Sequence, residues 1–282
     1  MSPLFDAHNH LHDAWLTPDR ARIFADLAVI GVQRTVVNGT SESDWPDVAT
    51  LAREESIVLP SFGLHPWDVG NRTSDWQKNL LAQLDANPGA AIGEIGLDRW
   101  ILDRARPDDA RLTGLRRAPI EEQLEVFQWQ LAVAAKRNLP ASIHCLDAFG
   151  VMNDTLRSAA RPSRGFLLHA YSGPAEMVPG FAQLGAYFSF NGGFLDPRKK
   201  RMHAVYAAIP VDRLLVETDA PAMRLPANLE EFPPISVPDG SLANHPGNLA
   251  IAYTGLAEWR GMTVESLASQ VAENFSRLFG AH

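Results

Sequence analysis

Two histidines near the start of the chain have a spacing suited to metal binding. They lie in residues 5–10, where Asp6, His8 and His10 occupy alternate positions of an apolar, strand-like stretch. Because alternate side chains of a strand share one face, all three should point the same way. The two imidazoles can then converge on one cation, and the Asp6 carboxylate could orient one ring from behind. The alternative is a surface strand with two incidental histidines.

Side chains that can bind metal or handle protons recur where other apolar runs end. Those beyond the first run are His65, Glu94, His144, His169 and Asp219. One histidine at such a position is more often an ordinary polar residue than a ligand, but chance does not readily explain the whole series. We therefore predict a metal site from residues at these ends: His8, His10, Glu94, His144, His169 and Asp219, with His65 beside them.

The carboxylates in this series have different expected roles. Glu94 can bridge two cations through its two oxygens, and Gly93 and Gly96 would let other groups approach it closely. Asp219 follows an apolar run and could be a ligand, a general base or both. Glu217 has the same strand parity as Asp219, so we expect its side chain one layer deeper in the barrel. There it would either support the site or be a buried acid bonded to a neighbour.

The cysteine and the remaining histidines have simpler interpretations. Cys145 alternates with His144 and should therefore face the core. His12 lies past the end of the first run and is expected to be solvated. His203 falls in a helical pattern, where it is structural or exposed.

Composition restricts the class of protein. The chain has 282 residues, a formal net charge of −8 and a single cysteine. The acidic balance argues against a general nucleic-acid coat protein, though not against an enzyme that meets phosphate through bound cations. No apolar run is long enough for a membrane span, and the start lacks a secretion signal. We expect a cytoplasmic protein, for which a monomer is a plausible state.

Repeated strand and helix patterns would bring the candidate residues together. Short apolar runs alternate with helical segments throughout the chain. The runs cover residues 4–11, 35–39, 57–62, 90–95, 140–145, 165–169, 186–190 and 213–216. Eight such units predict an α/β fold, a (β/α)8 TIM barrel with residues 1–282 as one domain. In a barrel the strand ends meet at one mouth, where active sites form. Residues 99–119 form a long polar loop, functional or merely solvated, and residues 223–246 a Pro-rich loop over the mouth.

Several short motifs span almost the whole chain in a fixed order. They are Asp6-Ala7-His8-Asn9-His10, Gly63-Leu64-His65-Pro66, Gly93-Glu94-Ile95-Gly96-Leu97-Asp98, Ile143-His144, His169-Ala170-Tyr171-Ser172-Gly173, Glu217-Thr218-Asp219-Ala220-Pro221 and Glu273-Asn274-Phe275. With these motifs the chain resembles the TatD-like metal-dependent hydrolases, a branch of the amidohydrolase-type barrels. The Gly-Glu-Ile-Gly-Leu-Asp and Glu-Thr-Asp-Ala-Pro motifs are the specific ones.

The resemblance implies a hydrolase with two divalent metal ions, commonly a deoxyribonuclease. It places one metal among four residues and a second among three that share Glu94. The first set is His8, His10, Glu94 and Asp219, and the second is Glu94, His144 and His169. It places His65 on the substrate side. Zinc, manganese and magnesium all suit these ligands.

Two departures from the family pattern lie where substrate would be chosen. The family often has Arg-Asn-x-Pro after the eighth strand, where the arginine helps to bind phosphate, but here residues 243–246 read Ala-Asn-His-Pro. Asn244 keeps its place as a supporting or substrate-side residue, and Arg224 could substitute for the arginine. The 99–119 segment is also longer than usual.

These observations predict hydrolysis of an ester bond. The first expectation is a phosphodiesterase acting on DNA or a small phosphodiester, with metal-activated water and Asp219 as proton acceptor. Glu94 and His65 would complete the catalytic group. The second is a carboxylic ester or amide hydrolase, including one acting on aminoacylated nucleic acid. A non-catalytic, metal-stabilised binding protein on the same barrel is the alternative from another class.

Overall fold

A computed structural model describes residues 2–238 and 240–280; the predicted 1–282 domain includes residues 1, 239, 281 and 282, which lie outside the described residues. Eight parallel strands form one sheet whose hydrogen-bonded order follows the chain from β1 to β8. The strands are β1 (Leu4–Asn9), β2 (Val32–Asn38), β3 (Val58–Phe62), β4 (Ala91–Asp98), β5 (Ala141–Leu146), β6 (Phe166–Leu168), β7 (Ala186–Asn191) and β8 (Leu214–Glu217). The predicted (β/α)8 barrel is confirmed.

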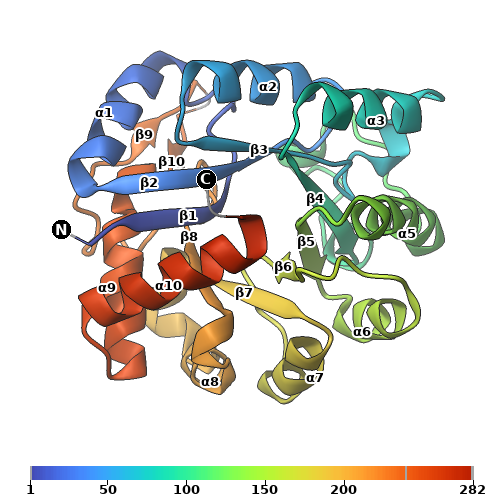
Figure 1. Ribbon diagram of the computed structural model, residues 1–282. Helices are drawn as coiled ribbons and strands as arrows, with labels where there is room; N and C mark the ends of the chain where they lie inside the picture. Colours follow the sequence, from blue (N-terminus) through green and yellow to red (C-terminus); the bar gives the residue numbers. More distant parts are fainter. Residues whose placement is uncertain (1, 239, 281–282) are drawn as a thin grey trace.

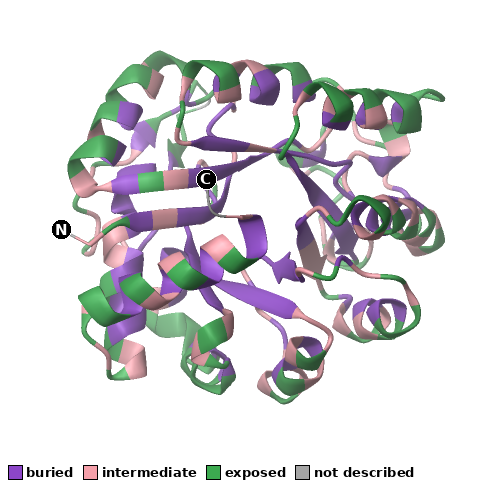
Figure 2. Ribbon diagram, viewed as in Figure 1, coloured by how far each residue is buried: buried purple, intermediate pink, exposed green. Residues whose placement is uncertain are grey.

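Helices surround the sheet (Figure 1). They are α1 (Arg20–Ile30), α2 (Trp45–Glu54), α3 (Trp76–Ala86), α4 (Trp100–Asp103), α5 (Ile120–Arg137), α6 (Phe149–Ser158), α7 (Val178–Gln183), α8 (Arg201–Ala208), α9 (Leu249–Arg260) and α10 (Val264–Phe279). Figure 2 shows strands that are buried nearly throughout and helices that expose their outer faces. This pattern explains why the strands read as continuous apolar runs, because a parallel barrel covers both faces of each strand.

Local sequence signals set several helix ends. Gly31 ends α1 with a left-handed φ of 86°, and Asn138 ends α5 with a φ of 50°. Both residue types tolerate this conformation at a helix C-terminus.

The barrel closes at a seam between β1 and the residues that follow β8. Asp219 donates its backbone N–H to His8 O at 3.0 Å, and His10 donates to Ala220 O at 2.8 Å. The buried Asp6 carboxylate accepts the Thr218 backbone N–H at 3.1 Å and the Thr218 hydroxyl at 2.6 Å. Asp6 therefore ties the first strand to the last. Among the described residues, Asp6 bonds backbone and hydroxyl groups and no histidine ring, so the expected ring-orienting role was wrong.

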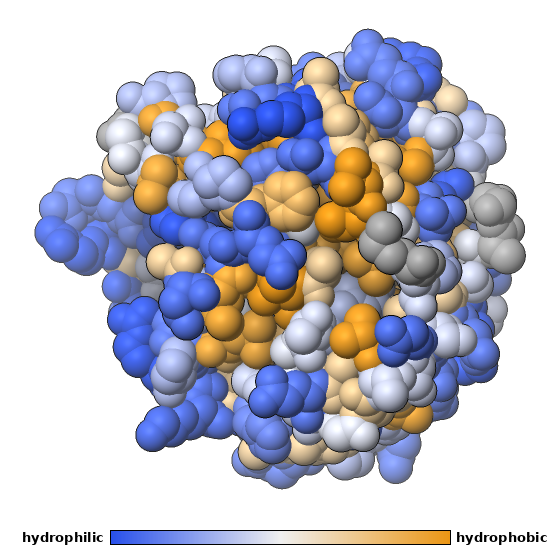
Figure 3. All heavy atoms as spheres, turned by 90° about the vertical axis from the view of Figure 1, so that its left-hand side faces the viewer, coloured by the Kyte–Doolittle hydropathy of each residue, from blue (hydrophilic) through white to orange (hydrophobic). Residues whose placement is uncertain are grey.

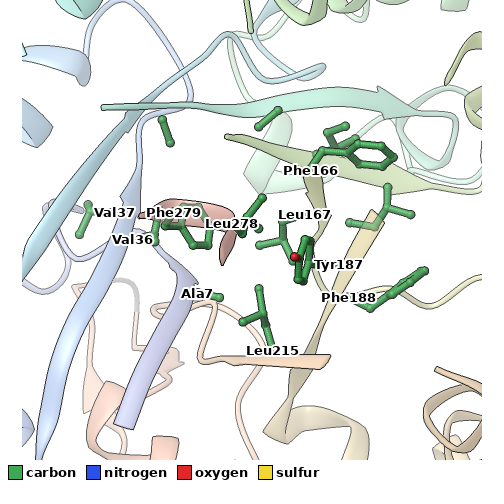
Figure 4. Close-up of a cluster of buried hydrophobic side chains, with 14 of the residues drawn as sticks. Ala7, Val36, Val37, Phe166, Leu167, Tyr187, Phe188, Leu215, Leu278 and Phe279 are labelled. Carbon is green, nitrogen blue, oxygen red and sulfur yellow. The ribbon is translucent and has the colours of Figure 1, made fainter. Parts of the chain in front are cut away.

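The end of the barrel opposite the mouth is closed by α10. Phe275 packs against Phe5 at the start of β1, with ring centroids 4.9 Å apart. The Asn274 amide donates to Leu214 O at 2.8 Å, at the start of β8. Figure 4 shows Leu278 and Phe279 among side chains of the barrel strands. With one end filled by this helix, the carboxyl ends of the strands remain as the open mouth.

The fourth strand differs from its predicted bounds. It continues through Asp98, so Glu94 lies within the strand and not at its end. Close packing against β5 accounts for the flanking glycines. A Cβ on Gly96 would lie 1.9 Å from His144 O, and one on Gly93 would lie 2.7 Å from Ser142 Cβ. The first strand also ends earlier than predicted, at Asn9, which leaves His10 just beyond it.

Both long loops contain ordered structure. The 99–119 segment includes α4, and the 223–246 segment includes a short antiparallel pair, β9 (Ile235–Ser236) and β10 (Leu242–Ala243). On the side of the molecule that carries α1 and α9, apolar residues gather toward the middle of the face with hydrophilic residues around them (Figure 3). Among the described residues, we find no helix with the length and apolarity needed to cross a membrane.

Candidate metal centre

Glu94 lies at the centre of the predicted ligand cluster. Its Oε2 is 3.4 Å from Nε2 of both His8 and His10. Its Oε1 is 2.9 Å from His144 Nδ1 and 2.8 Å from His169 Nε2. The two oxygens thus face two different pairs of histidines, which is the arrangement that a carboxylate shared by two cations requires.

Asp219 completes the first group. It follows β8 with a left-handed φ of 51°, and its Oδ1 lies 3.5 Å from His10 Nε2 and 3.8 Å from His8 Nε2. The ligand atoms of His8, His10 and Asp219 all lie within 4.8 Å of one another, as do those of His8, Glu94 and His169. All six predicted ligands therefore meet at one place in the mouth.

The two central carboxylates of the cluster, Glu94 and Asp219, remain ionised among the histidines. Although burial opposes ionisation, the charges of His169 and His65 help to hold the pKa of Glu94 well below its ordinary value. Burial also opposes ionisation of Asp219, but its interaction with His10 and the charges of the nearby histidines outweigh burial and lower its pKa. Burial instead lowers the pKa of His8, which favours the neutral imidazole that binds metals.

The two histidines of the first group are held by their Nδ1 atoms. His8 Nδ1 lies 2.8 Å from the Ser142 hydroxyl, and His10 Nδ1 lies 2.8 Å from Asn38 O. Each Nε2 is left to face the carboxylates. The buried His8 Nε2 has no hydrogen-bond partner among the described residues. Ligands of one tetrahedral zinc lie roughly 3.4 Å apart, so the observed spacings fit a shared cation.

Asp98 is a member of the site that sequence reasoning did not single out. Its Oδ2 lies 3.1 Å from His144 Nε2 and accepts the Trp67 indole N–H at 2.6 Å. Its Oδ1 accepts the Ile101 backbone N–H at 3.0 Å. Asp98 thus fixes the His144 ring so that Nδ1 faces Glu94. The signal was present, because Asp98 has the same strand parity as Glu94.

We expect Asp98→Asn to lower hydrolytic activity about 10- to 100-fold, the usual effect of removing a carboxylate behind a ligating histidine. The asparagine keeps the size of the side chain but loses the charge that aligns His144. The measurement is kcat at saturating substrate together with the metal concentration for half-maximal activity. An unchanged metal requirement would contradict a positioning role for Asp98.

Glu217 and His65 lie on opposite sides of the cluster. The Glu217 carboxylate accepts the Ser189 hydroxyl, and its Oε1 is 3.7 Å from His169 Nδ1. It is therefore a buried acid bonded to a neighbour and also lies behind His169, so both expected roles fit. His65 Nε2 lies 3.4 Å from Glu94 Oε1, and its ring lines an open hollow at the mouth.

The residues proposed for the loop after β8 bond partners within the protein. The Arg224 guanidinium is engaged by Glu230 through two bonds of 2.9 and 3.0 Å. This pairing makes Arg224 a poor substitute for the family's arginine. The Asn244 amide donates to Thr218 O at 2.9 Å and so supports the loop that carries Asp219. His245 points away toward α1, with Nε2 3.4 Å from Asp26.

Two hollows open at the mouth on either side of the cluster. The acidic hollow, about 330 Å³, is lined by His65, Asp13, Asp44, Asp68 and their neighbours. Burial raises the pKa of Asp68 to about 7. The basic hollow, about 420 Å³, is lined by His144, Asp219, Phe194, Lys199, Arg201 and their neighbours. His12 lines the acidic hollow and is buried, with Nε2 3.4 Å from Asp44, so the expectation that it is solvated was wrong.

The 99–119 segment forms part of the rim. Trp100 stacks on Trp67 with ring centroids 5.9 Å apart, and the Arg111 guanidinium lies 4.7 Å from the centroid of Trp100. Trp67 itself lines the acidic hollow. The segment is thus packed against the mouth and not merely a solvated insertion.

A barrel with a histidine and carboxylate cluster at its mouth is typical of metal-dependent hydrolases. The profile of the TatD-related DNase family matches residues 5–280, and the chain belongs to that family. It is a metal-dependent hydrolase of the nuclease type.

Individual relatives extend over nearly the whole chain. The chain is 30% identical over 282 residues to the 3′-5′ ssDNA/RNA exonuclease TatD of Escherichia coli (strain K12), covering 98% of this chain and 99% of the relative. It is 29% identical over 280 residues to the uncharacterized metal-dependent hydrolase YabD of Bacillus subtilis (strain 168), covering 98% of both. The crystal structure of the TatD homolog YjjV from Escherichia coli K12 has a TM-score of 0.83 at 24% identity, covering 99% of this chain and 98% of the other. That structure supports the fold.

Proposed function

We propose that this protein hydrolyses phosphodiester bonds of single-stranded nucleic acid with two divalent cations. The observation that carries the proposal is the position of Glu94, whose two oxygens each face a separate pair of histidines. The Escherichia coli relative named a 3′-5′ ssDNA/RNA exonuclease supports the substrate class. We further propose that residues 1–282 act as a single catalytic domain and that the protein works in the cytoplasm, where its single cysteine would stay reduced.

The metal ligands follow from the two faces of Glu94. One cation would be held by His8, His10, Glu94 and Asp219, and the other by Glu94, His144 and His169. Zinc, manganese or magnesium would supply the same chemistry, polarising a phosphoryl oxygen and lowering the pKa of water. The unpaired His8 Nε2 and the mixed histidine and carboxylate donor set fit such ions.

The remaining chemistry belongs to side chains of the protein. Asp219 lies at the edge of the cluster and lines both hollows, so its carboxylate can accept the proton of the attacking water. His65 lies across Glu94 from the first pair of histidines, where it can contact a phosphoryl oxygen of the substrate. Asp98 and Ser142 keep two of the histidine rings in their working orientation.

The test is cleavage of a 5′-labelled single-stranded oligonucleotide in the presence of added manganese, zinc or magnesium. We expect a descending ladder of products, and a rate at low substrate concentration that falls steeply with salt, because the substrate is a polyanion. A small uncharged ester should be a poor substrate with no such salt dependence. Rapid ester cleavage without any oligonucleotide cleavage would refute the proposal in favour of a carboxylic ester hydrolase.

A further inference from the structure

The basic hollow differs in charge from the rest of this acidic protein. Residues 198–201 are four consecutive cations, Arg-Lys-Lys-Arg, in a chain with 25 basic and 33 acidic residues. They join β7 to α8, and Arg198, Lys199 and Arg201 line the hollow that also contains His144, His169 and Asp219. A cationic rim therefore adjoins the predicted metal ligands on one side of the mouth.

We propose that the basic hollow binds the nucleotide next to the scissile bond, with its base on the apolar wall and its phosphates on Lys199 and Arg201. This inference rests on the proposed nuclease function and adds to it the location of the substrate strand.

The wall of the hollow has the character that an unpaired base needs. Phe194 and Met202 are buried, and Met223 and Leu146 are half-buried beside them. Lys199 Nζ lies 5.4 Å from the Phe194 ring centroid, so a cation and an aromatic face are next to each other. The hollow thus combines an apolar wall that a base can contact with cations that can bind its phosphates, and proteins that bind single strands without reading their sequence use a cationic groove beside apolar, mainly aromatic, side chains.

The cations of the rim differ in their availability. The exposed Arg198 guanidinium bonds Asp196 at 2.6 and 3.0 Å and is already paired. Within the described part of the chain, neither Lys199 nor Arg201 forms an ion pair, and both are exposed. Lys200, between them, is exposed but does not line the hollow.

The other hollow is unsuited to the same role. Asp13, Asp44 and Asp68 line it together with Glu94, and these carboxyl groups would repel a phosphate chain. Arg224, the other arginine considered for phosphate binding, is held by Glu230. Charge complementarity thus leaves the rim formed by residues 198–201 as the path for the strand.

The experiment compares binding of a fluorescein-labelled, single-stranded phosphorothioate decamer by fluorescence anisotropy. Its variants are the double substitution Lys199→Ala with Arg201→Ala, and Lys200→Ala as the matched control from the same run. We expect the double variant to raise Kd roughly tenfold at low salt and to reduce the slope of log Kd against log salt by about 1.4, which corresponds to two phosphate contacts. Lys200→Ala should change Kd about twofold or less.

Cleavage separates this inference from the function on which it rests. In the oligonucleotide cleavage assay, KM of the double variant should rise in parallel with its Kd. The unfolding temperature of the double variant should equal that of Lys200→Ala. If the wild type cleaves the strand but the double variant binds it as Lys200→Ala does, the subsite is wrong and the nuclease function stands. If the wild type cleaves no nucleic acid while binding still depends on Lys199 and Arg201, the function fails and the binding site stands.

Discussion

Replacing Glu94 with alanine should reduce phosphodiester hydrolysis by at least roughly a thousandfold while the barrel stays folded. The size of this effect follows from the number of groups that meet at one carboxylate. Its oxygens face His8 and His10 on one side and His144 and His169 on the other. Loss of the carboxylate would therefore disable both predicted cation positions at once. The measurement is kcat with a labelled single strand in manganese-containing buffer.

Controls for this variant distinguish lost chemistry from lost structure. Glu94→Gln keeps the volume of the side chain but not its charge, and should be as inactive as the alanine variant. Glu258→Ala removes an exposed acid from α9 and should retain wild-type activity. Circular dichroism and thermal unfolding then report on the fold. A folded Glu94→Ala protein that turns over at the wild-type rate would end the assignment of this site. Asp219→Ala should behave as Glu94→Ala does.

Removal of divalent metal should reduce hydrolytic activity as much as Glu94→Ala does, and addition of manganese, zinc or magnesium should restore it. His8 Nε2 faces the Glu94 and Asp219 carboxylates without a hydrogen-bond partner among the described residues, so these groups lose the cation that they would share once metal is removed. Metal bound only by the folded state also stabilises it, by about 2.7 kcal/mol at a free concentration of a hundred times Kd. Activity after chelation and the unfolding temperature with and without metal are the two measurements.

A matched variant makes the stability measurement specific. Wild-type protein should gain several degrees in its unfolding temperature on addition of metal, whereas Glu94→Gln should gain little. Equal gains in both proteins would locate the bound metal somewhere other than this cluster. Activity that persists in chelator would rule out metal-assisted hydrolysis altogether.

Much of the site could be predicted because a parallel barrel gathers the ends of its strands. The structure brings His8, His144 and His169 together at the mouth, as their positions in or just after apolar runs led us to expect. Glu94 was predicted as the bridging residue even though it lies within β4, because the flanking glycines indicated close approach of neighbouring groups. The structure shows that approach directly, with His144 O packed against Gly96.

Other contacts depend on register between strands that are far apart in the sequence. Asp6 was expected to support a histidine ring because both share one face of a strand. Its partner is instead Thr218, which is brought to it only by closure of the barrel. His12 was expected in solvent because it follows a strand, but α2 brings Asp44 against it. Strand parity predicts the direction in which a side chain points. It does not predict which residues of neighbouring elements will contact that side chain.

The seam between the first and last strands has a consequence for how this protein would lose activity. The bonds from Asp6 to Thr218 lie next to His8 in β1 and next to Asp219, which follows β8. Any fluctuation that separates β1 from the residues after β8 also moves His8 and Asp219 away from each other. A partly opened barrel could therefore retain most of its packing and still be inactive, because the contacts that close the barrel here also position two of the predicted metal ligands.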